Sequence, residues 1–242
     1  MIIHTFYVSL LLPVSTKIVG AFTLSSNRIP SFSFSLKSSS QNDVDRKIPK
    51  AIIFDLDGLI WTPEMYVNFF QNGRGSPFSV NPKDPLNLLT CGRRPVSLLG
   101  DSRFIFRDLF IDERFQNVKV GISSRTDEPE WARELLTKFP IPLTDEGIIG
   151  ECITLETVVS GPIEIAKDEK VDHFARIAKS CNIDFEDILF FDNEYRNCQS
   201  VAQLGVSVVY CPDGITRALW NRGLFEDFPR SDGTVINVDF AL

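Results

Sequence analysis

The chain has 242 residues, 25 of them Lys or Arg and 32 Asp or Glu, and a formal net charge of −7. This length allows one large domain or two small ones with a substantial core, and the net acidity argues against a general nucleic-acid binder, whose surface would carry clustered basic residues. No apolar run reaches the ~18 residues of a membrane span. The five Cys form no C-x-x-C pair, which disfavours a Cys/His zinc site or a disulfide framework.

The N-terminal segment differs from the rest in charge and composition. Residues 1–50 carry a net charge of +4, which leaves −11 for residues 51–242, and residues 1–40 contain ten Ser and no acidic residue. The apolar stretch Ile2–Val14, followed by small residues, is typical of a signal peptide, and the Ser-rich stretch after it is typical of a transit peptide. We therefore expect residues 1–47 to be a cleaved targeting presequence.

The order of these two signals resembles the bipartite presequences of proteins imported into secondary plastids of algae, in which a Phe often follows the first cleavage site. Phe22, directly after Ala21, fits that pattern loosely. A plastid is therefore the expected location, with a mitochondrial or secretory address, or a cytoplasmic protein with a non-functional leader, as alternatives. In each case the folded domain is expected to span residues 48–242.

Four short apolar runs predict strands buried on both faces, as in a parallel sheet. They occupy Ala51–Phe54, Val118–Ile122, Ile188–Phe191 and Val206–Tyr210. Helical patterns occupy Glu128–Phe139, Val171–Cys181, Asn197–Leu204 and Ile215–Leu224. Thr126 or Asp127 is expected to cap the first of these helices. Alternating strands and helices predict a three-layer α/β domain with a central, mainly parallel sheet.

Residues 62–100 interrupt this alternation. They contain several Gly and the prolines Pro63, Pro77, Pro82, Pro85 and Pro95. The segment is therefore predicted to be a long loop or a small, irregular, loop-like cap over one edge of the sheet. Loops of this length in compact domains are usually functional lids or disordered segments.

Polar side chains follow three of the predicted strands. Asp55 and Asp57 follow the first, Ser123 and Ser124 the second, and Asp192 the third. Ligands of open α/β sheets bind at this edge. One of two neighbouring carboxylates can attack as a nucleophile while the other transfers a proton, and Mg²⁺ would relieve the repulsion among the three Asp. Acids that merely solvate a strand end or a turn remain the structural alternative to this interpretation.

The order of the motifs is more specific than any one of them. The motifs are Pro49–Trp61 (PKAIIFDLDGLIW), Ser124–Thr126 (SRT), Lys170–Phe174 (KVDHF), Phe190–Asn197 (FFDNEYRN) and Leu204–Val206. In this order they resemble the haloacid dehalogenase superfamily with its Rossmannoid domain and, within it, the magnesium-dependent phosphatase-one family. The resemblance covers roughly residues 49–225 and is poor through residues 62–115.

The resemblance implies a role for each matching residue. Asp55 would be the nucleophile that becomes an aspartyl phosphate, and Asp57 would protonate the leaving oxygen and then deprotonate water. Ser124 and Lys170 would bind the transferring phosphoryl group. Mg²⁺ would be held by Asp55, by the backbone carbonyl of Asp57 and by Asp192. Dehalogenases lack an acid at the position of Asp57, which therefore indicates a phosphatase.

Several of these assignments have competitors in the sequence. Lys167 competes with Lys170, and Ser123 competes with Ser124; in both pairs the motif match favours the second residue. Arg125 is expected to bind substrate phosphate or to position its loop, with a plain surface residue as the alternative.

Three further residues bear on the site. His173 is interpreted as a packed histidine, although the family carries it, and Trp61 as a packing residue instead of a wall of the substrate entrance. Asn193 replaces the second acid that the family usually carries after the third strand, which predicts weaker Mg²⁺ binding.

The sequence therefore predicts a Mg²⁺-dependent phosphomonoester hydrolase that is a monomer without a membrane span or a nucleic-acid partner. Its substrate is expected to be a small phosphorylated molecule such as a sugar phosphate, or phosphotyrosine on a protein. The alternatives are a non-catalytic phosphate or phosphoprotein binder of the same fold, and a phosphotransferase that uses the same aspartyl phosphate.

Overall fold

The computed structural model describes residues 47–65, 75–144 and 150–237, and the predicted presequence lies outside these ranges except for Lys47. A six-stranded sheet forms the centre of the described part, in the order β12-β11-β10-β1-β6-β9, and all neighbouring strands pair in parallel. Its strands are β1 (Ala51–Phe54), β6 (Lys119–Ser124), β9 (Ile163–Ile165), β10 (Ile188–Asp192), β11 (Ser207–Tyr210) and β12 (Val235–Ile236). The predicted parallel sheet is confirmed, with β9 and β12 as additional edge strands.

The sheet is covered on both faces, which the residues of β1 make visible. Ile52 and Phe54 belong to one hydrophobic core, while Ala51 and Ile53 belong to a second core on the opposite face. A strand that packs on both sides needs apolar residues at every position, and all four residues of β1 are fully buried. The apolar run in the sequence is continuous because both faces of the strand are buried.

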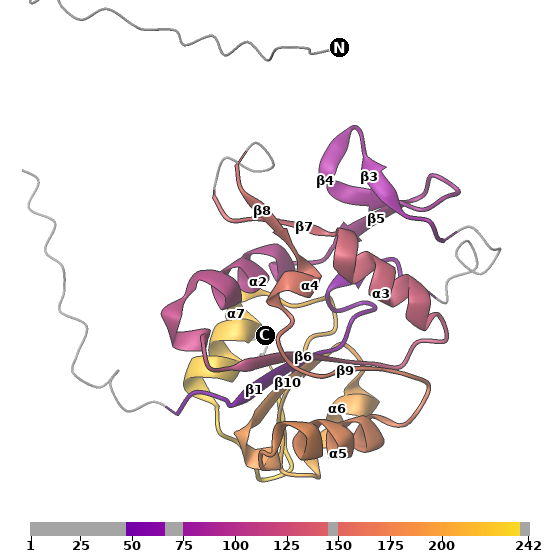
Figure 1. Ribbon diagram of the computed structural model, residues 1–242. Helices are drawn as coiled ribbons and strands as arrows, with labels where there is room; N and C mark the ends of the chain where they lie inside the picture. The colour runs from indigo at the N-terminus through magenta and orange to yellow at the C-terminus, as the bar shows by residue number, and fades with distance from the viewer. Residues whose placement is uncertain (1–46, 66–74, 145–149, 238–242) are drawn as a thin grey trace, which may run out of the picture. The chain divides into compact units, whose positions relative to one another are not determined.

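Helices from different parts of the chain cover the two faces (Figure 1). The second core is covered by α5 (Lys170–Cys181) and α6 (Tyr195–Ala202), and the first by α2 (Ser102–Ile111), α3 (Pro129–Lys138), α4 (Leu155–Val158) and α7 (Arg217–Asn221). The hairpin β7 (Pro140–Pro142) and β8 (Cys152–Thr154), two 3₁₀ turns (Glu113–Phe115 and Phe185–Asp187) and a π-helical turn after α7 (Arg222–Glu226) complete the described elements. The predicted three-layer α/β architecture is confirmed.

The helix boundaries correct one prediction. α3 begins after Glu128, whose side chain makes no capping bond, so neither Thr126 nor Asp127 is the N-cap. Thr126 instead accepts a hydrogen bond from the Glu128 backbone N–H at 3.1 Å, which shapes the turn that leads into the helix. Within the described residues, no helix is long and apolar enough to cross a membrane.

The segment 62–100 is more regular than the sequence predicts. It forms most of a four-stranded antiparallel sheet in the order β2-β5-β4-β3, referred to below as the small sheet. Its strands are β2 (Trp61–Thr62), β3 (Ser79–Asn81), β4 (Asp84–Leu89) and β5 (Pro95–Leu98). The segment is therefore built of strands where a loop was expected, because its prolines occupy positions that strands tolerate. Pro82 lies in the turn between β3 and β4, and Pro95 is the first residue of β5. Pro85 lies in β4 between Asp84 and Leu88, where the pairing with β3 shifts register.

Candidate active site

Three charged side chains meet at the carboxyl edge of the large sheet. Asp55 follows β1, Asp192 ends β10, and Lys170 begins α5. The Lys170 Nζ atom lies 2.6 Å from Asp55 Oδ1 and 3.1 Å from Asp192 Oδ2, and it also donates to the Ser123 carbonyl. All three charged residues are buried. The fold thus brings together the proposed nucleophile, a proposed metal ligand and the proposed phosphate-binding lysine.

The competing lysine lies elsewhere. The Lys167 side chain is 73% exposed and pairs with Asp127 at 3.3 Å. The Lys170 side chain is 1% exposed and inserts between two carboxylates. The geometry therefore favours Lys170 over Lys167 for charge neutralisation at Asp55.

The charges of this cluster do not balance. Burial raises the pKa of Asp55 above its usual value, an effect that Lys170 opposes and Asp192 reinforces. Burial alone would lower the pKa of Lys170, but the neighbouring Asp192 and Asp55 carboxylates raise it, so the lysine stays charged. Two carboxylates therefore share one lysine, and a further cation at this edge would offset the remaining negative charge.

Asp57 makes a different set of contacts. Its Oδ1 accepts a hydrogen bond from Trp61 Nε1 at 2.6 Å, and its Oδ2 accepts one from the Met65 backbone N–H at 3.0 Å. Burial raises the pKa of Asp57 to about 6, although both hydrogen bonds favour the charged form. A carboxyl group with a pKa in this range can both give and take a proton near neutral pH.

The residues present fit a magnesium ion through oxygen donors of mixed kind. In the described ranges, no three Asp, Glu, His or Cys side chains are grouped to hold a metal ion, since Asp57 is turned to Trp61 and Met65. Asn193 adds a candidate, because its buried Oδ1 has no hydrogen-bond partner among the residues described. A Cβ at Gly58 would lie 2.4 Å from Asn193 Nδ2, so glycine is needed for this close approach. Carboxylate, carbonyl and amide oxygens are the ligands that Mg²⁺ accepts.

A hydrogen-bond network that the sequence motifs do not reveal holds the Asp192 side chain. The Asp192 carboxylate accepts the Glu194 N–H at 2.7 Å, and the Asn197 amide nitrogen lies 3.2 Å from Asp192 Oδ2 and 3.0 Å from Glu194 Oε2. On the other side, the Arg125 guanidinium donates to Asn197 Oδ1 at 3.5 Å and to Glu169 at 3.2 Å. The amide orientation follows, because the nitrogen faces carboxylates and the oxygen faces a guanidinium. Asn197 lies within the FFDNEYRN motif, but its partners are visible only in the fold.

The two serines at the end of β6 face opposite sides of the strand. Ser123 Oγ lies 3.1 Å from His173 Nδ1, which is consistent with the interpretation of His173 as a packed histidine. Ser124 is buried at the end of the strand, and its backbone carbonyl accepts the Ala166 N–H at 3.1 Å. The hydroxyl of Ser124, not that of Ser123, is therefore the one that remains for a ligand.

Comparison with known proteins places this site in a family. Residues 47–228 match the acid phosphatase family. The chain belongs to this family. The phosphatase is 29% identical over 161 residues to a haloacid-dehalogenase-like hydrolase of Schizosaccharomyces pombe, covering 66% of this chain and 84% of that protein. It is 26% identical over 180 residues to magnesium-dependent phosphatase 1 of Homo sapiens, covering 74% and 86%. The superfamily resemblance drawn from the motifs is thereby confirmed.

Solved structures give more distant similarities. A haloacid-dehalogenase-like hydrolase from Xanthomonas campestris is 13% identical, with a TM-score of 0.44 and coverage of 71% of this chain and 86% of that one. An enzyme of the same superfamily from Bacteroides thetaiotaomicron, solved with magnesium and inorganic phosphate, is 14% identical, with a TM-score of 0.43 and coverage of 69% and 96%.

Proposed function

We propose that this phosphatase hydrolyses phosphomonoesters with Mg²⁺ through an aspartyl phosphate on Asp55. The observation that carries the proposal is the buried contact of Lys170 with Asp55 and Asp192 at the carboxyl edge of the sheet. Phosphoryl transfer depends mainly on charge neutralisation and in-line positioning. A buried carboxylate with a lysine and a second carboxylate beside it meets that requirement when a divalent cation completes the site. The magnesium named in the human relative agrees with this cofactor.

The two halves of the reaction use the same pair of aspartates. In the first, an Asp55 oxygen forms a bond to phosphorus while the bond from phosphorus to the leaving oxygen breaks, and Asp57 gives that oxygen a proton. In the second, Asp57 takes a proton from water, the water oxygen attacks phosphorus, and inorganic phosphate leaves Asp55. Mg²⁺, held by Asp55, Asp192 and the Asp57 carbonyl, would neutralise phosphate charge.

Two further side chains complete the proposed site. Ser124 would donate its hydroxyl to a phosphoryl oxygen, and Lys170 would neutralise that group while orienting Asp55. Of the two roles weighed for Arg125, loop positioning is favoured, because its guanidinium already binds Asn197 and Glu169. We propose sugar phosphates or phosphotyrosine on proteins as substrates.

The replacement Asp55→Asn tests the mechanism. It should abolish hydrolysis of p-nitrophenyl phosphate, because an amide cannot form the aspartyl phosphate. The matched control is Asp168→Asn, at a half-exposed acid that pairs with Arg176. EDTA should silence the wild-type enzyme and added Mg²⁺ should restore it. Full activity of Asp55→Asn, or hydrolysis by wild type that EDTA does not inhibit, would contradict the proposal. Transfer of the phosphoryl group to an added alcohol, without release of inorganic phosphate by water, would instead indicate the phosphotransferase.

We also propose that residues 1–47 direct the enzyme to a plastid. The proposal is supported by the net charge of +4 over residues 1–50, and by the apolar and Ser-rich stretches in tandem.

A further inference from the structure

We propose that Trp61 is a positioning residue for the proton transfers that the proposed function assigns to Asp57, and this inference rests on that function. The indole Nε1 donates to Asp57 Oδ1 at 2.6 Å, a short contact of the charge-assisted kind. The Met65 backbone N–H holds Oδ2 at 3.0 Å. Each carboxylate oxygen therefore has its own donor, and together the two donors set the rotamer of the side chain.

The donor itself cannot move freely. The Trp61 side chain is fully buried, and its ring stacks on Phe139 with the centroids 6.0 Å apart and an interplanar angle of 21°. Its backbone pairs with Leu98 where β2 meets β5 of the small sheet. An indole that is fixed by packing loses little further freedom when it binds a carboxylate, so the contact positions Asp57 and not the reverse.

The turn between the two residues closes on itself. The Gly58 N–H donates to the Trp61 carbonyl at 3.0 Å, and the Ile60 and Trp61 N–H groups both bond to the Leu56 carbonyl, at 2.8 and 3.3 Å. Gly58 has a φ of +75°, which a non-glycine residue would adopt only with strain. This tight turn brings a residue four positions later back over Asp57, so the catalytic loop and the first strand of the small sheet form one unit.

The consequence concerns orientation. A group that transfers a proton must lie within hydrogen-bond reach of the reacting atom, and small displacements are costly. A Phe at position 61 would keep most of the packing against Phe139 but would free one Asp57 oxygen. The side chain could then leave the orientation from which it reaches the leaving oxygen.

The test compares Trp61→Phe with wild type on aryl phosphates whose leaving phenols become progressively more basic. The value of kcat/KM reports the first step, the transfer of the phosphoryl group to Asp55. In that step a basic leaving phenolate needs a proton from Asp57, whereas p-nitrophenolate, the least basic leaving group, needs it least. The ratio of kcat/KM for phenyl phosphate to that for p-nitrophenyl phosphate should fall ~10-fold in Trp61→Phe, a part of the roughly 10²–10⁴-fold that general acid catalysis supplies. The matched control is Trp220→Phe, at a buried tryptophan that stacks on Phe54 and Phe191 and should leave the ratio unchanged.

An equal fall for all substrates in Trp61→Phe, or a wild-type ratio, would overturn the inference. Asp57→Asn separates this failure from a failure of the proposed function. If Asp57→Asn keeps the wild-type ratio, the acid assignment itself is wrong; if it lowers the ratio and Trp61→Phe does not, the positioning role alone is wrong. Should Trp61→Phe fold poorly by thermal unfolding, the tryptophan isostere benzothienylalanine at position 61 removes the N–H and keeps the ring shape, and the same ratio decides.

Discussion

The residues of this site are held by burial and by each other. Lys170, Asp55 and Asp192 are nearly excluded from solvent, and the desolvation of such groups is repaid only when every charge has a partner. Removing one partner of a buried pair commonly costs about 3–5 kcal/mol, so stability measurements must accompany activity measurements at these positions. The buried Oδ1 of Asn193, a neutral side chain beside Asp192, has no hydrogen-bond partner among the described residues.

His173 should make the enzyme sensitive to mild acid. Burial, together with the nearby charges of Lys170 and Arg176, lowers the pKa of His173 from the usual 6.5 to about 4. Between pH 6.5 and pH 4 this histidine is protonated in the unfolded chain but not in the folded chain. The stability is therefore fully present above pH 6.5 and falls as the pH drops towards 4. The free energy of unfolding should lose up to about 3 kcal/mol through this residue.

Urea unfolding of wild type and His173→Gln between pH 7.5 and pH 4 measures the effect. The variant should lose less stability over this range than wild type does. His4→Gln, at the other histidine of the sequence, should behave like wild type. Parallel stability curves for wild type and His173→Gln would show that His173 does not titrate in this way.

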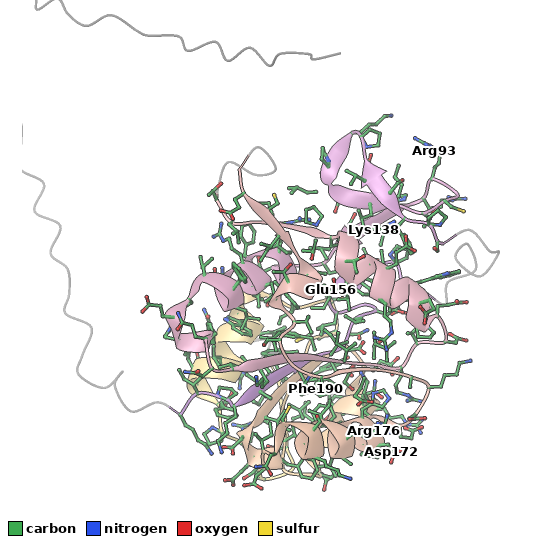
Figure 2. All side chains as sticks on the ribbon, in the orientation of Figure 1. Arg93, Lys138, Glu156, Asp172, Arg176 and Phe190 are labelled. Carbon is green, nitrogen blue, oxygen red and sulfur yellow. The ribbon has the colours of Figure 1, made fainter. Side chains whose placement is uncertain are left out.

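Among the elements, the small sheet is fastened to the helices beneath it. Glu134 of α3 accepts hydrogen bonds from Ser76 Oγ at 2.6 Å and from the Phe78 N–H at 2.9 Å. Lys138, labelled in Figure 2 where α3 ends beside the small sheet, donates to the Phe78 carbonyl and to Glu134. On α2, the Arg103 guanidinium donates to the Leu86 carbonyl at 2.8 Å and to that of Pro140 at 2.6 Å. Buried side chains of the small sheet and of the segment before it (Phe78, Leu88 and Val96) belong to the core of the main domain.

Glu134→Ala should therefore loosen the small sheet. The variant removes the carboxylate that accepts from the Ser76 hydroxyl and the Phe78 N–H, and it removes one of the two acceptors of the Lys138 ammonium. This loss should lower the free energy of unfolding by about 1–3 kcal/mol. Amide hydrogen exchange over residues 76–81 should become faster. Glu130→Ala, at an exposed acid of the same helix, is the control. Equal exchange in the two variants would mean that Glu134 does not anchor this segment.

Over the whole molecule, the net charge of −7 is the sum of +4 over residues 1–50 and −11 over residues 51–242. Lys47 pairs with Asp187 at 2.8 Å, Lys50 pairs with the same carboxylate at 2.6 Å, and the family match also begins at residue 47. These two lysines hold the pKa of Asp187 below its usual value. The expected domain start at residue 48 therefore leaves out a contact of the folded part.

Fragments should separate the two roles of the chain. Residues 47–242 should retain the phosphatase activity of the full chain, because every proposed catalytic residue lies within them. A fragment 48–242 should be less stable by at most about 1 kcal/mol, the usual worth of a half-exposed ion pair.

Fused to a fluorescent protein, residues 1–46 should direct it to the plastid of an algal cell. Diffuse fluorescence would refute the proposed address, and an inactive 47–242 fragment would show that the leader has a structural role.

Local features of the sequence were enough to predict most of the large sheet. Apolar runs such as Ala51–Phe54 are continuous because both faces of each strand are buried, and acids such as Asp55 follow directly on the chain. α2 escaped prediction because its exposed face also carries large apolar residues, among them Phe104, Phe110 and Ile111, which obscures the amphipathic pattern. The small sheet was not predicted because prolines disfavour strands, and the sequence does not show which positions of a strand they occupy.

By itself the sequence determined the family, the layered fold and the acids at the strand ends, because these depend on short patterns and on motif order. The tertiary structure decided the partners. Lys170 reaches Asp55 across 115 positions, Asn197 joins Asp192 to Arg125, and Trp61 turns back onto Asp57. Each of these contacts depends on where packed elements place a side chain in space, and spacing along the chain does not encode that position.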